Sequence, residues 1–309
     1  MSGADPVTGV GSADGGLGAV GVVGLGVMGS AMSTHLLAHG AVVHGYDPDV
    51  GRTREHVARG GVAAASAAEV ASAAAAVVVT SLPGAGALAD VVGGPQGLGA
   101  GGRPGLVVIE ASTLSLESKT AARDVAATWG GQVLDCPMSG TGQQARDGDL
   151  VAYLSGDAPA KAVALPVLAA FTRGQHDVGD FGNGTRMKLV ANLLVAVHNA
   201  AAAEALLLAQ RSGLDLEQVL AAVGDGAGSS RMFQVRGPRM VGRHYTEPTA
   251  TVTTMEKDLA LIAGFAASVA SPTPLLAATG VLYQAALAQD RAGQDTACVY
   301  EVLRRLAGS

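Results

Sequence analysis

Val22-Val23-Gly24-Leu25-Gly26-Val27-Met28-Gly29 is the stretch that decides the fold, because it spells G-x-G-x-x-G directly after a pair of valines. In such a segment the first glycine permits a tight turn, the second lets a pyrophosphate approach the backbone, and the third lets the following helix pack closely on the strand. The free N–H groups at the start of that helix then point at the phosphates. We therefore predict that Gly24 to Gly29, with Leu25, Val27 and Met28 between the glycines, form the phosphate-binding turn of a dinucleotide site.

Short runs of β-branched residues alternate with longer alanine-rich segments from Ala19 to about Gly179. This alternation is typical of βαβ units and of a parallel sheet. The glycine turn opens the first unit, so the expected architecture is a Rossmann-type, doubly wound α/β domain. The predicted strands are Ala19–Val23, Ala41–Tyr46, Ala75–Ser81, Leu106–Glu110, Gln132–Cys136, Leu150–Ser155 and His176–Gly179.

Asp47 lies 18 residues after Gly29, at the end of the second predicted strand. A carboxylate there can accept both ribose hydroxyls of the dinucleotide and would repel a 2′-phosphate, so it favours NAD over NADP. A second interpretation is an Asp-Pro turn in which Asp47 only caps the next helix. Arg52 and Arg54 follow closely and leave acceptance of NADP open.

The β-rich runs stop after Gly184, and one long helix is predicted from Thr185 to Arg211. Its length of about 40 Å would be enough to connect two domains. Beyond it the pattern is helical, with breaks near 224–229, 242–248 and 271–274. We predict a flexible glycine-rich tail over residues 1–17, a dinucleotide-binding domain over 18–181, and an all-α domain over 182–309 that is entered by the long helix.

Composition restricts the class of partner. The chain carries a net charge of −6 and has no basic run, which argues against binding to nucleic acid. Two cysteines, Cys136 and Cys298, cannot form a disulfide framework, and the N-terminus lacks the pattern of a signal peptide. A cytoplasmic protein with a small-molecule partner is therefore expected.

The run from Leu189 to Gln210 is apolar enough to raise the alternative of a membrane span. It contains Asn192, His198, Asn199 and Glu204, whose side chains are costly in lipid. We therefore predict that this run is a buried helix of a soluble domain and that the protein has no membrane partner.

Lys188 and Asn192 are four residues apart on the predicted long helix, so their side chains lie on one face, one turn apart. Burial of a lysine on an apolar helix would lower its pKa toward the range of a general acid or base. The competing interpretation is an exposed lysine at the start of the helix, and spacing alone leaves both open.

Three further segments resemble motifs of the β-hydroxyacid dehydrogenase family. Asp135-Cys136-Pro137-Met138-Ser139-Gly140-Thr141 is similar to its substrate-binding D-x-P-x-S-G-G, and Gly182 to Asn192 is similar to its catalytic G-x-G-x-x-x-K-x-x-x-N. Lys257-Asp258-Leu259 is similar to its K-D-L segment. Together with the glycine turn, four motifs occur in family order from about Ala19 to the end of the chain.

The resemblance implies an NAD-dependent enzyme that transfers a hydride to or from a small 3-hydroxyacid, such as a hydroxyisobutyrate-, glycerate- or threonate-like acid. It makes Lys188 the catalytic lysine and Asn192 an amide that orients the substrate. Ser139 and Gly140 become the turn that binds the substrate carboxylate. Family positions expected to lie beside the cofactor are Ser81, Leu82, Pro83, Ser112, Thr113 and Lys257, the last also close to the substrate.

The C-terminal half is most similar to the L-threonate and 3-hydroxyisobutyrate dehydrogenase branches, on runs that include Gly228 to Phe233. Three residues depart from the family. Thr141 replaces the second glycine of S-G-G and would narrow the carboxylate turn, and Ala191 stands where an amide or imidazole is common. Arg231 replaces a bulky apolar side chain, and it either binds an acidic substrate in bidentate fashion or lies on the surface. Thr141, Arg231 and Phe233 complete the predicted substrate-binding residues.

Two other functions remain open on the sequence: an imine reductase, which resembles this fold but generally lacks the catalytic lysine, and a dinucleotide-binding protein without turnover. No metal is expected, because His35 and His39 have no third ligand nearby in the sequence. The apolar long helix and the alanine-rich C-terminal helices favour a homodimer or homotetramer. The expected partners are thus a small carboxylate substrate and further copies of the chain.

Overall fold

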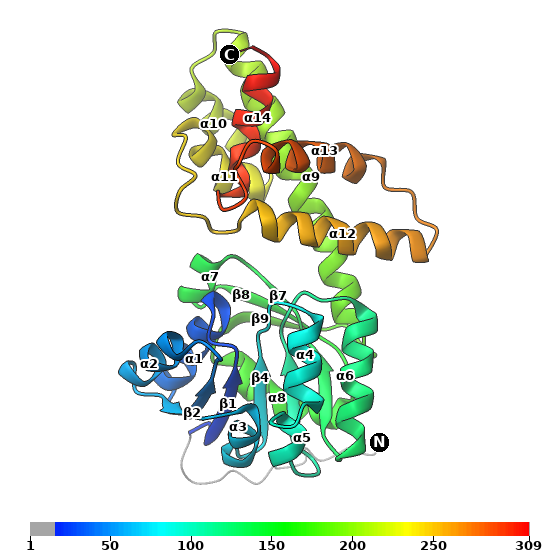
Figure 1. Cartoon of the computed structure of the whole chain (residues 1–309). Helices are drawn as coiled ribbons and strands as arrows, with labels where there is room; N and C mark the ends of the chain where they lie inside the picture. Colours follow the sequence, from blue (N-terminus) through cyan, green and yellow to red (C-terminus); the bar gives the residue numbers. More distant parts are fainter. Residues whose placement is uncertain (1–15, 309) are drawn as a thin grey trace, which may run out of the picture.

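A computed structural model describes residues 16–308 of the chain. Figure 1 shows an α/β domain below and a helical domain above, joined by one long helix, α9 (Asn183–Arg211). Residues 1–15 of the flexible tail predicted over 1–17 lie outside the described residues. Leu17, at the end of that stretch, packs partly buried against the core of the α/β domain.

The main sheet has six parallel strands in the order β3-β2-β1-β4-β5-β6. This order turns back on itself between β1 and β4, as in a doubly wound fold, and it confirms the predicted fold class. Valine dominates β1, β4 and β5 because these strands are buried on both faces. The strands are β1 (Ala19–Val23), β2 (Val42–Tyr46), β3 (Val62–Ala63), β4 (Val77–Thr80), β5 (Val107–Glu110) and β6 (Gln132–Asp135).

Helices cover both faces of this sheet. Val20, Val22 and Val79 enter a core with α1 and α8, whereas Val78 and Val108 enter a second core with α3, α4 and α6. Neighbouring residues of one strand thus serve opposite faces, as the two-residue period of a strand requires. The helices of this domain are α1 (Val27–Ala38), α2 (Val50–Ala58), α3 (Ala67–Ala73), α4 (Ala85–Gly93), α5 (Leu98–Gly101), α6 (Leu116–Thr128), α7 (Gly142–Arg146) and α8 (Ala158–Ala169).

A second, smaller sheet carries the predicted substrate turn. In it β7 (Met138–Ser139) is antiparallel and β9 (Thr172–Asp177) is parallel to β8 (Leu150–Leu154). An isolated bridge between Asp135 and Ser155 connects it to the end of β6. The expectation that all strands share one parallel sheet is therefore wrong for the last two predicted strands. The sequence Thr-Arg-Gly-Gln-His-Asp of β9 lacks the apolar run of a buried parallel strand, so the pattern locates its start poorly.

The helical domain is built around α9, which begins two residues before its predicted start. Its N-cap Gly182 has a left-handed φ of +95°. Leu189, Ala196 and Leu206 of α9 enter a core shared with the surrounding helices. The three predicted breaks are confirmed, and residues 288–295 form a further one. The surrounding helices are α10 (Leu216–Asp225), α11 (Arg231–Val241), α12 (Val252–Ser268), α13 (Pro274–Leu287), a short 3-10 turn (Thr296–Cys298) and α14 (Val299–Leu306).

Within residues 16–308, α9 is the one helix long and apolar enough to cross a membrane by length and composition, and 44% of its most apolar window is buried in the protein. Asn192 and Asn199 are buried on it and bonded to Asp258 of α12 and Tyr283 of α13. A core helix passes the same test of length and composition. These contacts place α9 in the core of the helical domain.

Candidate active site

The glycine turn joins β1 to α1 and keeps its backbone open on one side. A side chain at Gly24, which has a φ of +89°, would meet the Ser81 carbonyl oxygen at 2.2 Å, and one at Gly29 would meet the Gly24 carbonyl oxygen at 1.8 Å. A Cβ at Gly26 would have only the end of Arg52 within 4 Å. Gly26 is the N-cap of α1 and has no side chain with which to cap the helix. The first N–H groups of α1 are therefore available to a phosphate, which fits the pyrophosphate of a dinucleotide.

The residues between the glycines contribute their backbone to this turn. Leu25 is buried, and Met28 packs partly buried against the same core. Val27 is exposed at the first position of α1. The predicted phosphate site is therefore a surface of main-chain N–H groups, to which Val27 adds apolar area.

Asp47 follows β2 and is tied to the glycine turn. Its Oδ2 accepts a hydrogen bond from the Leu25 N–H (2.8 Å), and its Oδ1 accepts one from the Asp49 N–H (2.9 Å). Arg52 Nη1 lies 3.4 Å from Oδ2. Oδ1 keeps a second lone pair with which it can accept from a ribose hydroxyl, and Oδ2 can do so where the long bond from Arg52 Nη1 is given up. The interpretation in which Asp47 caps the next helix is wrong, because Asp49 caps α2 through the Gly51 N–H.

The ends of β4 and β5 meet close to this turn. The Ser112 hydroxyl, after β5, accepts a hydrogen bond from the Leu82 N–H, after β4 (2.8 Å). The Thr113 carbonyl oxygen accepts one from Lys257 Nζ of α12 (2.9 Å), which links the two domains. This is the carboxyl edge of the sheet beside the point where the strand order turns back, which is where dinucleotides bind in doubly wound folds. The structure gathers there Ser81, Leu82, Pro83, Ser112, Thr113 and Lys257.

Lys188 lies in the second turn of α9 and is 8% exposed. Its amine makes no hydrogen bond or ion pair with residues 16–308. Burial lowers the pKa of Lys188 to about 8; the charge of Asp258 opposes this effect, and those of Lys257 and Lys119 add to it. The expectation of a buried lysine with a lowered pKa is confirmed, and the competing one of an exposed lysine is wrong. Such an amine can give or take a proton near neutral pH.

Asn192, one turn after Lys188, faces α12. Its Nδ2 donates to Asp258 Oδ2 (2.8 Å), and Lys257 Nζ lies 3.4 Å from Asp258 Oδ1. Burial raises the pKa of Asp258 against the opposing charges of Lys257 and Lys188. Two lysines, one carboxylate and one amide from two helices thus form a single polar cluster.

The predicted carboxylate turn lies between β7 and α7. Gly140 has a φ of +145°, and a side chain there would meet Leu150 at 2.5 Å. Thr141 is the N-cap of α7: its hydroxyl accepts from the Gln144 N–H (3.3 Å), and its own N–H donates to Gln144 Oε1 (3.0 Å). The Thr141 N–H is therefore engaged, whereas its hydroxyl only accepts and keeps its O–H to donate, as Ser139 and Gly140 can, to an anion.

Two family models match consecutive parts of the chain. One, described as the NAD binding domain of 6-phosphogluconate dehydrogenase, matches residues 19–181, and one described as NAD-binding of NADP-dependent 3-hydroxyisobutyrate dehydrogenase matches residues 182–303. L-threonate dehydrogenase of Cupriavidus necator is 34% identical over 286 residues, which are 92% of this chain and 95% of that protein. The chain belongs to the β-hydroxyacid dehydrogenase family.

Two further relatives of this dehydrogenase agree. Glyoxylate/succinic semialdehyde reductase 2 of Arabidopsis thaliana is 31% identical over 286 residues, which are 92% of this chain and 79% of that protein. A solved structure of 3-hydroxyisobutyrate dehydrogenase from Salmonella typhimurium has a TM-score of 0.83 at 31% identity and covers 92% of this chain and 99% of that one. The chain is therefore an oxidoreductase that binds an NAD(P) cofactor.

Two predicted substrate residues of the dehydrogenase come from α11, and the structure separates them. The Phe233 side chain is 4% exposed and packs in the core of the helical domain, and its contact with the substrate stays a prediction. Arg231 is exposed and makes no hydrogen bond or ion pair with residues 16–308. Hydrogen bonds from Gln144 and Arg173, with a smaller contribution from the charge of Arg231, hold the pKa of Asp149 below its ordinary value. The charge of Arg231, on α11, thus acts on Asp149 of the α/β domain, whose carboxylate accepts from Gln144 of α7.

Sequence reasoning missed the contacts of four charged residues in this dehydrogenase. Asp258 was noted only as the neighbour of Lys257. Glu110, Lys119 and Asp135 form a fully buried ion triad, with Lys119 Nζ 2.6 Å from Glu110 Oε2 and 2.9 Å from Asp135 Oδ1. The available signal was that one predicted strand ends in Glu110 and the next carries Asp135 one residue before its end, because neighbouring buried carboxylates require a cation.

The histidine pair of α1 has a packing role. His35 Nε2 bonds the carbonyl oxygens of Ala145 and Arg146 (both 3.0 Å) and so links α1 to α7, while His39 Nδ1 bonds the His35 carbonyl oxygen (2.8 Å). Among residues 16–308 no group of three or more His, Cys, Asp or Glu side chains is placed to hold a metal ion.

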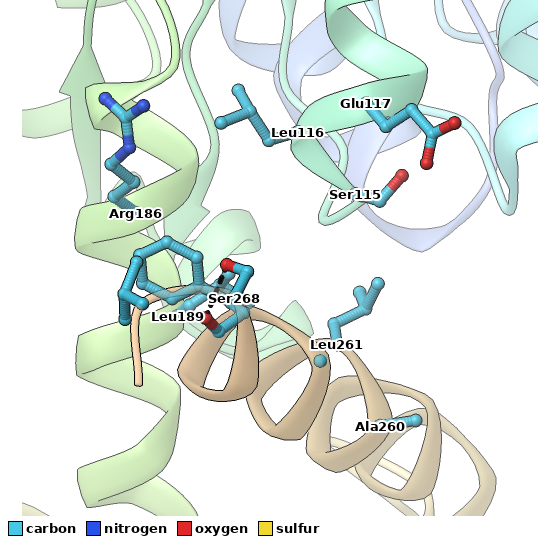
Figure 2. A pocket seen from close by; sticks show the side chains of 11 residues that line it. Ser115, Leu116, Glu117, Arg186, Leu189, Ala260, Leu261 and Ser268 are labelled. Carbon is cyan, nitrogen blue, oxygen red and sulfur yellow. Dashed lines mark hydrogen bonds between the residues drawn. The ribbon is translucent and has the colours of Figure 1, made fainter. Parts of the chain in front are cut away.

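A hollow of about 400 Å³ lies between the two domains (Figure 2). Leu116 and Glu117 of α6, Arg186 and Leu189 of α9, and Leu261 of α12 are among the side chains that line it. None of the predicted site residues, all of which lie within 16–308, belongs to its lining. The lining thus comes close to the Lys188 cluster in sequence, at Leu189 and Ala260, without including its members.

Proposed function

We propose that this dehydrogenase transfers a hydride between NAD and a small 3-hydroxyacid, with hydroxyisobutyrate-, glycerate- and threonate-like acids as the candidates. The observation that carries the proposal is the Lys188 amine, which is buried, has no protein partner within residues 16–308, and has a pKa of about 8. Relatives named for threonate and 3-hydroxyisobutyrate support this substrate class. The bound nicotinamide would supply the hydride acceptor or donor.

Lys188 is the general base of oxidation and the general acid of reduction in this proposal. The neutral amine accepts the proton of the substrate hydroxyl, and the ammonium returns a proton to the forming alkoxide. Burial and the charge of Lys257 favour the neutral amine, whereas Asp258 favours the ammonium. These opposing effects keep both protonation states accessible near neutral pH.

Ser139 and Gly140 bind the substrate carboxylate, and Asn192 orients the hydroxyl. Because Asp258 accepts from Asn192 Nδ2, the amide oxygen of Asn192 is left to accept from the substrate. Thr141 contributes its N–H only if Gln144 releases it. Arg231 is the contact for a distal acidic group. Together these residues position the reacting carbon, which supplies much of the rate enhancement of such an enzyme.

The cofactor is held by the turn from Gly24 to Gly29, by the ends of β4 and β5, and by Lys257. The Asp47 carboxylate favours NAD, since it can accept from ribose hydroxyls and repels a 2′-phosphate. In this proposal a domain over residues 18–181 binds the cofactor, and a second domain over residues 182–309 completes the substrate site.

A homodimer or homotetramer in the cytoplasm is part of the same proposal. Met187, Val190, Leu194 and Leu208 are large apolar side chains on the outer face of α9, with exposed fractions of 41%, 55%, 48% and 70%. Their spacing of three, four and fourteen residues keeps them on one side of the helix. A second copy of the chain would cover this apolar stripe.

The proposal is tested by following NADH absorbance during incubation with a panel of short 3-hydroxyacids and sugar acids. We expect oxidation of at least one acid, and loss of most turnover in Lys188→Met with NAD affinity nearly unchanged. Lys161→Met is the matched control, because Lys161 pairs with Asp177 in the α/β domain (2.7 Å) outside the candidate site. Absence of oxidation by wild-type protein that binds NAD would reject the proposal, and turnover of cyclic imines with NADH would replace it by imine reduction.

A further inference from the structure

Glu110 and Asp135 end two neighbouring strands, β5 and β6, and are paired in register at the carboxyl edge of the main sheet. Lys119 of α6 lies between them, and all three side chains are completely buried. Burial alone disfavours the ammonium, but the two carboxylates outweigh it and raise the pKa of Lys119 above its ordinary value. Lys119 is therefore a cation throughout the working pH range of the enzyme.

Glu110 connects this ion triad to the turns on the cofactor side of the site. Its Oε1 accepts a hydrogen bond from the Ser112 N–H (3.0 Å), and the Ser112 hydroxyl accepts one from the Leu82 N–H (2.8 Å). One carboxylate thus fixes the turn after β5 directly and the turn after β4 through Ser112. Both turns carry residues assigned to the cofactor in the proposed function.

Asp135 connects the triad to α9, the helix that presents Lys188. Its Oδ2 accepts from the Thr185 N–H (2.7 Å) and its Oδ1 from the Thr185 hydroxyl (2.8 Å). The Ser155 hydroxyl donates to the Asp135 carbonyl oxygen (2.9 Å) and accepts from the Gly184 N–H (3.0 Å). The N-cap of α9, Gly182, has no side chain with which to cap, so Asp135 supplies the cap from a different strand.

We propose that Lys119 is a positioning residue for hydride transfer: its ammonium locks the turns that hold the cofactor to the first turn of the helix that presents Lys188. This inference rests on the proposed function, because it gives Lys119 a part in that reaction. A buried ion pair adds little net stability relative to apolar packing of the same volume. The geometric linkage between the two halves of the site is therefore the consequence of the triad that can be measured.

The primary test compares Lys119→Met with Lys161→Met. In the first variant we expect kcat to fall by about tenfold to a hundredfold, as a misplacement of about 1 Å would cause, and NAD to bind several-fold more weakly. Amide hydrogen exchange of residues 183–188 should accelerate, because Asp135 no longer holds a fixed orientation. The pH at which oxidation reaches half its maximum should rise, since the Lys119 charge helps to lower the pKa of Lys188. Lys161→Met should leave all four readouts near wild type.

Two further variants keep the test decisive if Lys119→Met does not fold. Lys119→Arg retains the cation and should keep the wild-type pH profile. Thr185→Val retains the triad but loses the hydroxyl bond to Asp135; it should lower kcat and accelerate exchange of the first turn of α9, with NAD affinity unchanged. Thr279→Val is the control for it, because Thr279 is a buried threonine of α13 in the other domain.

An unchanged kcat, pH profile and exchange rate in folded Lys119→Met overturns the inference, and so does a Thr185→Val protein that matches Thr279→Val. A lower melting temperature with unchanged kinetics would show that the triad has a purely structural role, and it would also overturn the inference. Amide hydrogen exchange and NAD binding can both be measured in a protein that does not turn over a substrate. A wild-type protein that oxidises no hydroxyacid would therefore reject the proposed function while leaving the linkage to be decided by these two measurements.

Discussion

The side-chain amide of Asn192 donates a 2.8 Å hydrogen bond to Asp258, and this bond connects α9 to α12 one turn beyond Lys188. The same carboxylate favours the ammonium form of Lys188, so one side chain sets both the orientation of an amide and the proton affinity of an amine. Asp258 is therefore the place where substrate orientation and proton transfer are coupled in the proposed mechanism.

Asp258→Asn removes the charge that favours the Lys188 ammonium. We expect the pKa of Lys188 to fall below about 8, so that oxidation reaches half its maximum at a lower pH, and kcat to fall by about tenfold because the charged acceptor of Asn192 is replaced by a weaker, neutral amide oxygen. Steady-state rates of NADH formation across the neutral and alkaline range measure both effects. Asp124→Asn, an exposed aspartate of α6, is the control. An unmoved profile in folded Asp258→Asn would remove Asp258 from this role.

Lys188 should give the two directions of the reaction opposite pH dependences. Burial lowers its pKa to about 8, and oxidation needs the neutral amine. The kcat/KM of oxidation should therefore rise with pH and level off above this value, whereas that of reduction, which needs the ammonium, should fall. Initial rates of NADH formation and consumption over one set of buffers test this. Parallel changes in the two directions would contradict the assignment.

Asp47→Asn should shift cofactor preference toward NADP. The substitution removes the carboxylate that would repel a 2′-phosphate and releases Arg52, now 3.4 Å from Asp47 Oδ2, to bind it. We expect the ratio of kcat/KM for NAD to that for NADP to fall by about tenfold or more. Asp124→Asn, an exposed aspartate of α6 that pairs with Arg123, should leave the ratio unchanged. Equal ratios in both variants would show that Asp47 does not select the cofactor.

Gln144→Ala should strengthen binding of the substrate carboxylate. It frees the Thr141 N–H, which now donates to Gln144 Oε1 (3.0 Å), to join Ser139 and Gly140 around the anion. We expect a lower KM for the hydroxyacid with the KM for NAD unchanged, and a loss of about 1 kcal/mol of folding stability from the broken capping box. Gln143→Ala on the same short helix is the control. A higher substrate KM would mean that Gln144 itself contacts the substrate.

The fold was predictable wherever the information is local. The glycine turn, the valine-rich strands and the apolar run of α9 each carry their structure in consecutive residues, and the strand order of the main sheet follows from the doubly wound pattern. The small sheet was not predictable in this way. β7 has two residues and β9 is polar, so neither strand shows an apolar period, and their pairing is set by contact with β8.

The candidate site was predictable to the extent that motifs mark it. The family motifs indicated Lys188, Asn192 and the turn at Ser139, but no motif shows which partner a buried charge will meet. Asp135 bonds Thr185, fifty residues away, and Asn192 bonds Asp258, sixty-six residues away. Such partners depend on the packing of whole elements, which is why Asp258 and the triad around Lys119 emerge only from the structure.

The continuous helix α9 has a mechanical consequence. Its first turn is fixed to Asp135 in one domain, while Ala196 and Leu206 are embedded in the core of the other. A helix without an internal proline resists sharp bending, and α9 contains none, so the two domains are connected by a stiff segment. Any change in the distance between the proton-transferring amine and the nucleotide turns therefore requires that α9 bends or that the bonds between Asp135 and Thr185 break.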